Sequence, residues 1–535
     1  MKGQMKRDSI YRITPRMAGQ PRGDISTMGF KAFNLARMGH LGLPVPPAFV
    51  LGTPHCRRWL QEPERSRKSL AASLEEQMHW LQSATGLGFG DPRNPLLVSV
   101  RSGAPVSMPG MMDTLLNIGL CDATAGGIMR TTGNPRLVWD SYRRLIAHFA
   151  EVVFSASPQP FMDALAAMLA RERLESPREL DYLGLSELAG KYLRLFHDAT
   201  GRHFPQDPLQ QLDLAVQAVI TSWNSPRARE YRRIYRVSDD ICTAVTIQQM
   251  VFGNAGGTSG AGVGFTRDPD TGEKRLYFDF LFNSQGEDIV SGRITGSDAE
   301  RLFVSLPEMR RDLPDICGVL EREFGDAQEF EFTIEDDILY LLQTRTAKRT
   351  PWAALRIAVE LVREGLIGRS EALARLDGLS LDDIRRGRLA STGKEPFCRG
   401  QASGGNVAVG PLALDVDAVH RYSSADGGPA VLVRDEMTTE DIAGIALCAG
   451  VLTARGNRTS HAAVVARQLG KACVTGCSGL RIDQARRSVG FGDRSLAEGE
   501  LITLDSNTGE VYGGRVEVIT EYPTEWLEEI RRWRS

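Results

Sequence analysis

The sequence predicts a multidomain α/β protein, and three observations support this. The chain has 535 residues, which is enough for two to four domains. Short β-branched stretches alternate with amphipathic ones in two separate segments, residues 1–350 and residues 396–514. Residues 351–395, which lie between them, have helical spacing and predict a linker, and residues 515–535 predict a short exposed helix.

The composition is typical of a globular protein without polyanionic partners. Hydrophobic residues make up 42% and charged residues 24%, and the net charge of −3 comes from 64 basic and 67 acidic side chains. This balance gives no reason to expect nucleic acid or an anionic membrane as a partner. No apolar run approaches the roughly 20 residues that span a membrane, and the N-terminus lacks the apolar core of a signal peptide. We therefore expect a cytoplasmic protein with reduced cysteines.

The first segment contains a candidate cation and a candidate phosphate loop. "PLLVSVRSGA" (residues 95–104) predicts a strand that runs into a turn, with Arg101 at the strand end. A helical pattern follows from about 125 to 235, for example in "LQQLDLAVQAVITSW". "GNAGGTSGAGVGFTR" (residues 253–267) predicts a glycine-rich loop whose backbone N–H groups, with the Thr258 and Ser259 hydroxyls, could approach phosphates. A flexible hairpin loop without a ligand is the alternative, and glycine content does not decide between them.

A β-hairpin is predicted at "FEFTIEDDILYLLQTR" (residues 330–345), with "EDD" as its turn. Glu329 and Glu331 are two residues apart and so project from one face of the first strand, whereas Phe330 and Phe332 project from the other. Two carboxylates on one face suit Mg²⁺ that bridges nucleotide phosphates. A solvated strand face is the alternative.

The most informative stretch is "TARGNRTSHAAVVARQLG" (residues 453–470), in which a strand ends in glycine and an apolar helix follows. Thr459 or Ser460 is a natural N-cap, and Gly470 can end the helix. One face of this helix is predicted to be apolar: Ala462, Val465, Ala466 and Leu469.

His461 then falls in the first helical turn, where unpaired N–H groups and the helix dipole form an anion site. An imidazole at an anion site suggests a phosphoryl acceptor, with the phosphoryl group held by the Thr459 and Ser460 hydroxyls and by Arg455 or Arg458. A structural histidine at a strand–helix turn is the alternative. Metal ligation is disfavoured because no second ligand follows at the right spacing.

These motifs resemble those of the pyruvate, phosphate dikinase family. "LTARGNRTSHAAVVARQLGKACVTGC" is similar to the phosphohistidine segment of that family, and "SVRSGAPVSMPGMMDTLLNIGL" to the segment that carries its ATP-binding arginine. The similarity runs from about residue 24 to residue 514. It implies an ATP-grasp-like nucleotide-binding domain at 1–350 with a helical subdomain at about 125–235, a helical linker at 351–395, a swivelling phosphohistidine domain at 396–514 and a tail helix at 515–535.

The resemblance also implies roles for individual residues. His461 is the phosphorylated nucleophile, and Thr459 falls on the position that is phosphorylated in regulated members. ATP is bound by Lys31, Arg101, Gln343 and Arg345, of which the two arginines also act in catalysis, and Glu329 and Glu331 hold Mg²⁺. The chain departs from the family pattern at several positions: Asn457 replaces a glycine, Arg458 a methionine, Glu329 an aspartate, and Phe30 and Ala32 the glycines on either side of the family lysine. Arg458 would either hold phosphate more tightly or favour a different docking face, and the Lys31 loop would be less permissive.

The implied reaction uses ATP and inorganic phosphate to phosphorylate His461, leaving AMP and pyrophosphate. Pyruvate or another acceptor then takes the phosphoryl group. The family's (β/α)₈ barrel for pyruvate and phosphoenolpyruvate needs on the order of 250 residues. Only 21 residues follow Gly514, so we expect no such barrel here and an acceptor supplied in trans, for example by a separate barrel protein. Two alternatives stay open: a phosphohistidine carrier or signalling protein, and a non-catalytic nucleotide-binding remnant.

Overall fold

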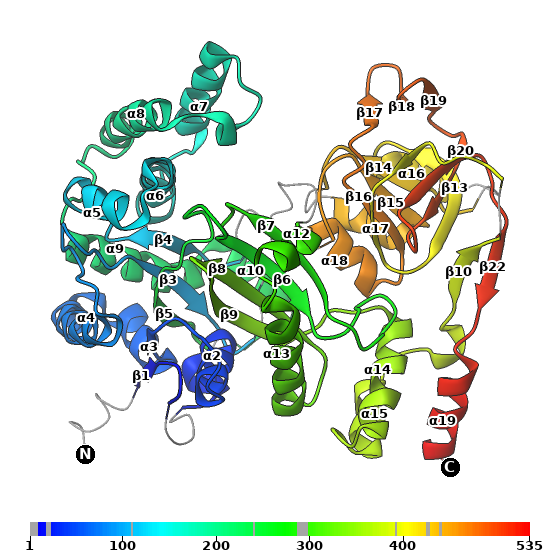
Figure 1. Cartoon of the computed structure of the whole chain (residues 1–535), viewed down its shortest axis with the longest axis horizontal. Coiled ribbons are helices and arrows are strands. Elements are labelled where there is room, and N and C mark those ends of the chain that lie inside the picture. The colour runs from blue at the N-terminus through cyan, green and yellow to red at the C-terminus, as the bar shows by residue number, and fades with distance from the viewer. Residues whose placement is uncertain are drawn as a thin grey trace. The chain divides into compact units, whose positions relative to one another are not determined.

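The computed structural model describes residues 9–17, 23–106, 108, 111–238, 241–285, 298–390, 393–423, 428–437, 441–458 and 460–534. The chain divides into two compact units (Figure 1). Unit 1 is Met1–Ser259 with Ile334–Thr344, and unit 2 is Gly260–Thr333 with Arg345–Ser535. Both units contain helices and strands, so the predicted mixed α/β, multidomain architecture is confirmed. Among the described residues, no helix is long and apolar enough to cross a membrane.

Unit 1 is built on an antiparallel five-stranded sheet with the strand order β1-β2-β5-β3-β4. Its strands are β1 (Ile10–Ile13), β2 (Ala48–Leu51), β3 (Val98–Gly103), β4 (Thr114–Ile118) and β5 (Ala244–Gln249). The predicted strand at residues 95–104 is β3, but Arg101 lies within it and not at its end. The strand continues because Ser102 and Gly103 still pair with β5.

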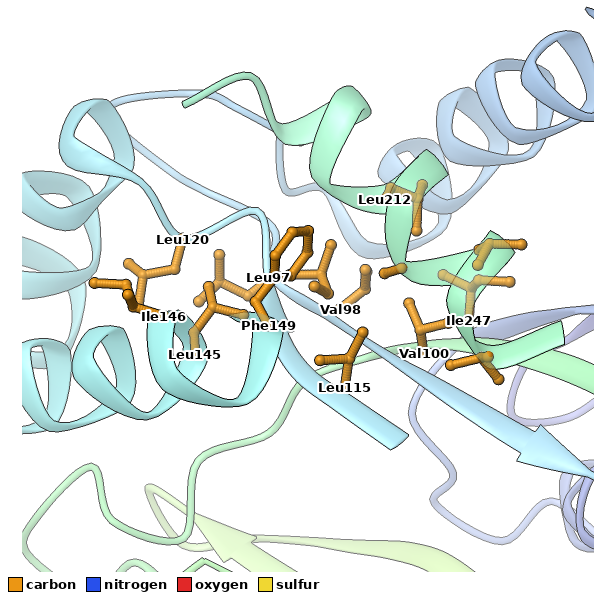
Figure 2. Packing of buried hydrophobic residues seen from close by; sticks show 14 of the residues in the cluster. Leu97, Val98, Val100, Leu115, Leu120, Leu145, Ile146, Phe149, Leu212 and Ile247 are labelled. Atoms are coloured by element: carbon orange, nitrogen blue, oxygen red, sulfur yellow. The ribbon is translucent and has the colours of Figure 1, made fainter. Parts of the chain in front are cut away.

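Helices cover this sheet, and the helical pattern predicted at about 125–235 corresponds to α5 through α10. The helices of unit 1 are α1 (Ile25–Met28), α2 (Phe30–His40), α3 (Thr53–Gln61), α4 (Pro63–Thr85), α5 (Asp122–Thr132), α6 (Pro135–Phe154), α7 (Gln159–Glu172), α8 (Tyr182–Thr200), α9 (Pro208–Thr221) and α10 (Pro226–Ile234). Figure 2 shows how strand residues such as Val98 and Val100 pack with Phe149 of α6 and Leu212 of α9. This core fixes β3, and with it the position of Arg101.

A second sheet has the order β7-β6-β8-β9. Its strands are β6 (Gly260–Phe265), β7 (Tyr277–Phe282), β8 (Gln328–Glu335) and β9 (Ile338–Thr346), and the helices α12 (Ala299–Ser305) and α13 (Met309–Phe324) precede β8. The glycine-rich loop predicted at 253–267 is therefore too long, because its second half is strand β6. Glycines alternate along that strand to make room for phenylalanine rings. A Cβ added at Gly262 would lie 2.2 Å from Phe332 Cζ, and one at Gly264 would lie 2.5 Å from Phe330 Cζ.

Replacing Gly262 by alanine should therefore destabilise unit 2 by about 1–3 kcal/mol, because the ring of Phe332 has to move out of a packed core. Chemical denaturation measures the loss. The matched control is Gly318→Ala in α13, where the nearest atom to a new Cβ is the flexible Arg322 Nη1 at 3.3 Å. Alanine there should be neutral or stabilising, since it favours a helix. Equal effects of the two substitutions would contradict the packing role of the β6 glycines.

The C-terminal part of unit 2 contains an eight-stranded sheet with the order β11-β21-β20-β13-β14-β15-β16-β12. Its strands are β11 (Cys398–Arg399), β12 (Gln401–Ser403), β13 (Val407–Ala413), β14 (Val431–Arg434), β15 (Gly450–Thr453), β16 (Ala472–Thr475), β20 (Leu501–Asp505) and β21 (Glu510–Gly513). Only Gly400 separates β11 from β12, which form the two ends of this order, so the sheet is rolled. Beside it lie α16 (Val416–Ser423), α17 (Ile442–Leu447), α18 (His461–Gln468) and a small sheet of β17 (Leu480–Asp483), β18 (Ser488–Phe491) and β19 (Arg494–Ala497).

The predicted linker and the predicted tail form one structure. The linker contains α14 (Pro351–Arg363), α15 (Arg369–Arg375) and β10 (Arg386–Leu389), and the tail contains β22 (Val518–Glu521) and α19 (Thr524–Arg534). β22 pairs antiparallel with β10, as Figure 1 shows. Ile530 of α19 is fully buried in the same cluster as α14, and Trp526 packs against Trp352. The prediction of an exposed tail helix was therefore wrong, because α19 closes the hydrophobic face of α14.

Candidate functional site

In unit 1, the helix of Lys31 begins against the end of the strand of Arg101. The Phe30 N–H donates to the carbonyl oxygen of Ala104 at 3.0 Å, directly beyond β3. Gly29 has a φ of 76°, and a Cβ there would lie 1.9 Å from the Gly103 oxygen, so only glycine fits. The segment around Lys31 is thus a helical turn and not the loop that was predicted. Phe30 and Ala32 are ordinary helical residues of α2, and the essential glycine is Gly29.

Arg101 is a partly buried cation that has no counter-ion among the described residues. Its strand neighbours are Thr114 on β4 and Thr246 on β5. No ion pair or side-chain hydrogen bond to Arg101 exists within the part of the chain that the structure describes. A guanidinium group that has lost part of its hydration gains from a bound anion, and it binds phosphate oxygens well. Arg101 therefore fits the predicted role in phosphate binding.

Gln343 is held near the helix of Lys31 by a backbone contact. The Asn34 side chain in α2 donates from Nδ2 to the carbonyl oxygen of the adjacent Thr344 at 3.0 Å, in a buried position. Gln343 and Arg345 are two residues apart on β9, as predicted, and so share one face of that strand. Unit 1 thus brings together α2, the end of β3 and β9, which carry Lys31, Arg101 and Gln343.

The structure does not bring Thr258 and Ser259 close to the elements that carry Lys31, Arg101 and Gln343. Thr258 Oγ1 donates to the carboxylate of Asp337, and Ser259 Oγ accepts from the N–H of Asp336 at 3.2 Å. Asp336 and Asp337 form the turn of the β8–β9 hairpin. Gln343 lies six residues further along β9, which corresponds to about 20 Å of strand. The two hydroxyls therefore hold the glycine-rich loop onto the turn, at the opposite end of β9 from Gln343.

Glu335, which sequence reasoning missed, lies before this turn and has an unusual pKa. Burial raises the pKa of its carboxyl group to about 7. A hydrogen bond from the Phe252 N–H lowers this pKa, and the nearby charge of Asp336 raises it further. The folded protein therefore binds a proton that the unfolded chain has already released once the pH exceeds its ordinary value of 4.5. The contribution of Glu335 to stability is complete below pH 4.5 and is lost as the pH rises to about 7.

Replacing Glu335 by glutamine should remove this pH dependence. Between pH 5 and pH 8 the wild-type protein should lose up to about 3 kcal/mol of stability from this group, since one pKa unit corresponds to ~1.4 kcal/mol. Denaturation at several pH values should show a flatter profile for Glu335→Gln, with the largest gain at pH 8. Asp312 on α13, a half-buried carboxylate paired with the exposed Arg311, provides the control through Asp312→Asn. Parallel wild-type and Glu335→Gln profiles would contradict the assignment.

In unit 2, Glu329 and Glu331 lie on β8 as predicted, with Phe330 and Phe332 buried on the other face. Glu329 is 5% exposed and forms an ion pair with Arg345, while Glu331 is partly exposed. Burial would lower the pKa of Arg345, but Glu329 and Glu331 together raise it above its ordinary value. Arg345 is thus paired with Glu329, one of the two carboxylates that were predicted to hold a metal.

Glu329 and Glu331 fit Mg²⁺ only if other ligands complete its coordination shell. Among the described residues, no group of three or more histidine, cysteine, aspartate or glutamate side chains could hold a metal ion. Glu329 and Glu331 supply two oxygen ligands from one strand face, so phosphate oxygens and water would have to complete the shell. That mixture of few carboxylates with substrate phosphates is the usual pattern for Mg²⁺.

His461 lies at the predicted junction. Strand β15 ends at Thr453, Gly456 adopts a φ of 113°, and Ser460 is extended and precedes the helix. His461 is the first residue of α18. Thr459 lies outside the described residues. The hydroxyl of Ser460 is buried and has no hydrogen-bond partner within the described part of the chain, and Arg455 forms an ion pair with Asp435.

The buried face of α18 agrees with the predicted one at Val465 and Ala466 and differs from it at Leu469. Ala463 and Ala466 are fully buried. Leu469, which was predicted to lie on the apolar face of the helix, is 46% exposed. Arg467 is also fully buried, and its Nε donates to Asp270 Oδ1 at 2.8 Å. Sequence reasoning missed this arginine. Its place in a helix of alanines and valines was the available signal, because such a helix face buries a cation only when a counter-ion is present.

Comparisons with known proteins show which family the chain resembles. Residues 65–311 match the family model described as "Pyruvate phosphate dikinase, AMP/ATP-binding domain", and residues 427–509 match "PEP-utilising enzyme, mobile domain". The chain is 41% identical over 491 residues to pyruvate, phosphate dikinase 2 of Zea mays, covering 91% of this chain and 55% of that protein. It is 41% identical over 510 residues to pyruvate, phosphate dikinase of Clostridium symbiosum, covering 95% and 58% respectively. The chain thus spans about half the length of the curated relatives it matches.

Proposed function

The chain belongs to the pyruvate, phosphate dikinase family, and from that premise we propose that it uses ATP and inorganic phosphate to phosphorylate its own His461. The observation that carries the proposal is the position of His461 as the first residue of α18. The first-turn N–H groups have no acceptor within the helix, so they are available for a phosphoryl group on the imidazole.

In the proposed reaction, a ring nitrogen of neutral His461 attacks the β-phosphorus of ATP. The new N–P bond replaces the bond between that phosphorus and the oxygen that leaves with AMP, and the γ-phosphoryl group passes to inorganic phosphate to give pyrophosphate. Arg101, Lys31 and Arg345 neutralise phosphate charge, and Gln343 binds the nucleotide. Glu329 and Glu331 would hold Mg²⁺, which neutralises charge on the phosphate oxygens when bound. Positioning and charge neutralisation supply most of the catalysis of such a transfer.

We further propose that phospho-His461 passes its group to pyruvate, the acceptor in the names of the relatives. His461 belongs to the histidine segment (residues 396–514), of which residues 427–509 match the family model of the mobile domain. A segment that takes a group at one place and delivers it at another needs to move as a body, and the rolled sheet with its own core provides that body.

Isotope labelling tests the proposal. The protein is incubated with β-³²P-labelled or γ-³²P-labelled ATP, with and without phosphate, and acid-labile, base-stable label is measured. We expect β-label on His461 together with AMP, and γ-label in pyrophosphate only when phosphate is present. Pyruvate is then added to the labelled protein, alone and with a pyruvate-binding dikinase fragment, to test transfer within the chain and in trans. Absence of β-label under all conditions would contradict the function.

A further inference from the structure

Within unit 2, the helix that begins with His461 is fastened at its other end. Arg467 Nη2 donates to Ser403 Oγ at 3.0 Å, and its Cζ lies 5.5 Å from the centre of the Phe265 ring. Its partner Asp270 lies in the turn of the β6–β7 hairpin (residues 260–282). The same carboxylate oxygen also accepts the Gly404 N–H at 2.9 Å. One carboxylate of the hairpin thus binds the histidine segment at two points that are 63 residues apart in the chain.

Arg458 makes a second contact with the same hairpin. It lies three residues before His461, and its Cζ is 5.1 Å from the centre of the Tyr277 ring. Its backbone N–H donates to Gln401 Oε1 at 3.1 Å, and its carbonyl oxygen accepts from Arg467 Nη2 at 3.3 Å. These two hydrogen bonds hold the backbone of Arg458 within the histidine segment.

The groups with the largest effect on the pKa of Arg458 belong to the hairpin. Burial would lower the pKa of this guanidinium group, but Tyr277, Asp279 and Asp270 together raise it above its ordinary value. All three are residues of the β6–β7 hairpin. A dianionic phosphoryl group next to Arg458 would face the carboxylates of Asp270 and Asp279, which would repel it. The contact therefore favours docking on the hairpin over direct binding of phosphate.

We propose that Arg458 is a positioning residue that latches the histidine segment onto the β6–β7 hairpin, and that it is not a ligand of the phosphoryl group. The inference rests on the proposed function, because docking matters to catalysis only if His461 is phosphorylated. The attraction between a cation and the face of an aromatic ring is stronger in a partly desolvated site than at an exposed one. The methionine of the family pattern cannot make it. This chain therefore holds its histidine segment more firmly at the hairpin than a chain with methionine at that position would.

The first experiment measures docking without any phosphoryl transfer. Hydrogen exchange is followed in a His461→Ala background without ATP, in peptides that cover residues 266–282 and 399–406. Arg458→Met should speed exchange in both peptides by about tenfold, because the contact between Arg458 and Tyr277 protects both peptides from exchange. Tyr277→Leu should do the same, Tyr277→Phe should stay close to the parent, and the double variant should be no faster than either single one. Arg486→Met, at an exposed site of the same segment, is the matched control.

The second experiment uses rapid quenching in protein with His461 intact. Arg458→Met should slow β-labelling by about tenfold and leave the lifetime of the phosphohistidine unchanged, as expected for a residue that acts through docking. Unchanged exchange in the His461→Ala background would overturn the latch. So would a shortened phosphohistidine lifetime without any change in exchange, because that result identifies Arg458 as a phosphate ligand. Failure of the parent protein to label would refute the proposed function alone, since the exchange result does not depend on it.

Discussion

Replacing His461 by asparagine is expected to abolish covalent labelling by β-³²P-labelled ATP. The side chain is the proposed nucleophile, and an amide cannot form the N–P bond at useful rates. Removing a covalent nucleophile commonly lowers turnover by about 10³-fold or more, so AMP formation should fall with the label. Thermal denaturation of His461→Asn, measured beside the wild-type protein, checks that the loss of label does not come from unfolding.

The control is His420→Asn, which changes an exposed histidine in α16 of the same segment. It should label and turn over as the wild-type protein does. Nucleotide binding by His461→Asn, measured by calorimetry, should persist, because none of the proposed ATP ligands is altered. Label that persists on His461→Asn at the wild-type level would place the acceptor elsewhere in the chain and would refute the proposed mechanism.

Local patterns predicted those parts of the molecule that neighbours in the sequence determine. The alternation of glutamate and phenylalanine in β8 has a period of two, so Glu329 and Phe330 had to face opposite sides wherever the strand lay. The start of α18 directly after Ser460 was also predicted from neighbouring residues, although the Ser460 side chain makes no capping hydrogen bond within the described part of the chain. The predicted apolar face of α18 was right for Val465 and Ala466 but wrong for Leu469, because the core that packs against the helix, and not the helix alone, decides which residues are covered.

Distant partners account for the remaining differences. The density of glycines at residues 260–264 suggests a loop. The structure shows that these glycines leave space for the rings of Phe280, Phe330 and Phe332. Arg467 and its counter-ion Asp270 are separated by 197 residues, and Thr258 and its partner Asp337 by 79. No spacing rule in a single sequence connects such pairs. The resemblance of motifs indicated the candidate residues. It did not indicate that some of them, such as Thr258, form hydrogen bonds with other residues of the chain.

Replacing Arg101 by methionine is expected to lower the rate of His461 labelling at low ATP by about 10²–10³-fold. The guanidinium group is partly buried on β3 and has no counter-ion among the described residues, so the proposed partner is the triphosphate. Losing one well-placed charged donor to a transferring group typically costs this much. Arg101→Lys should recover part of the rate, because lysine keeps the charge but not the two-pronged hydrogen bonding.

Stability separates this role from a structural one. An unpaired cation within a sheet costs desolvation free energy in the folded state, so Arg101→Met should leave the melting temperature unchanged or raise it while activity falls. The control Arg67→Met removes an exposed arginine of α4 and should change neither quantity. Labelling rates at several ATP concentrations and thermal denaturation of the same preparations measure both effects. A fall in melting temperature that parallels the loss of activity would show that Arg101 supports the fold of unit 1 and does not bind the nucleotide.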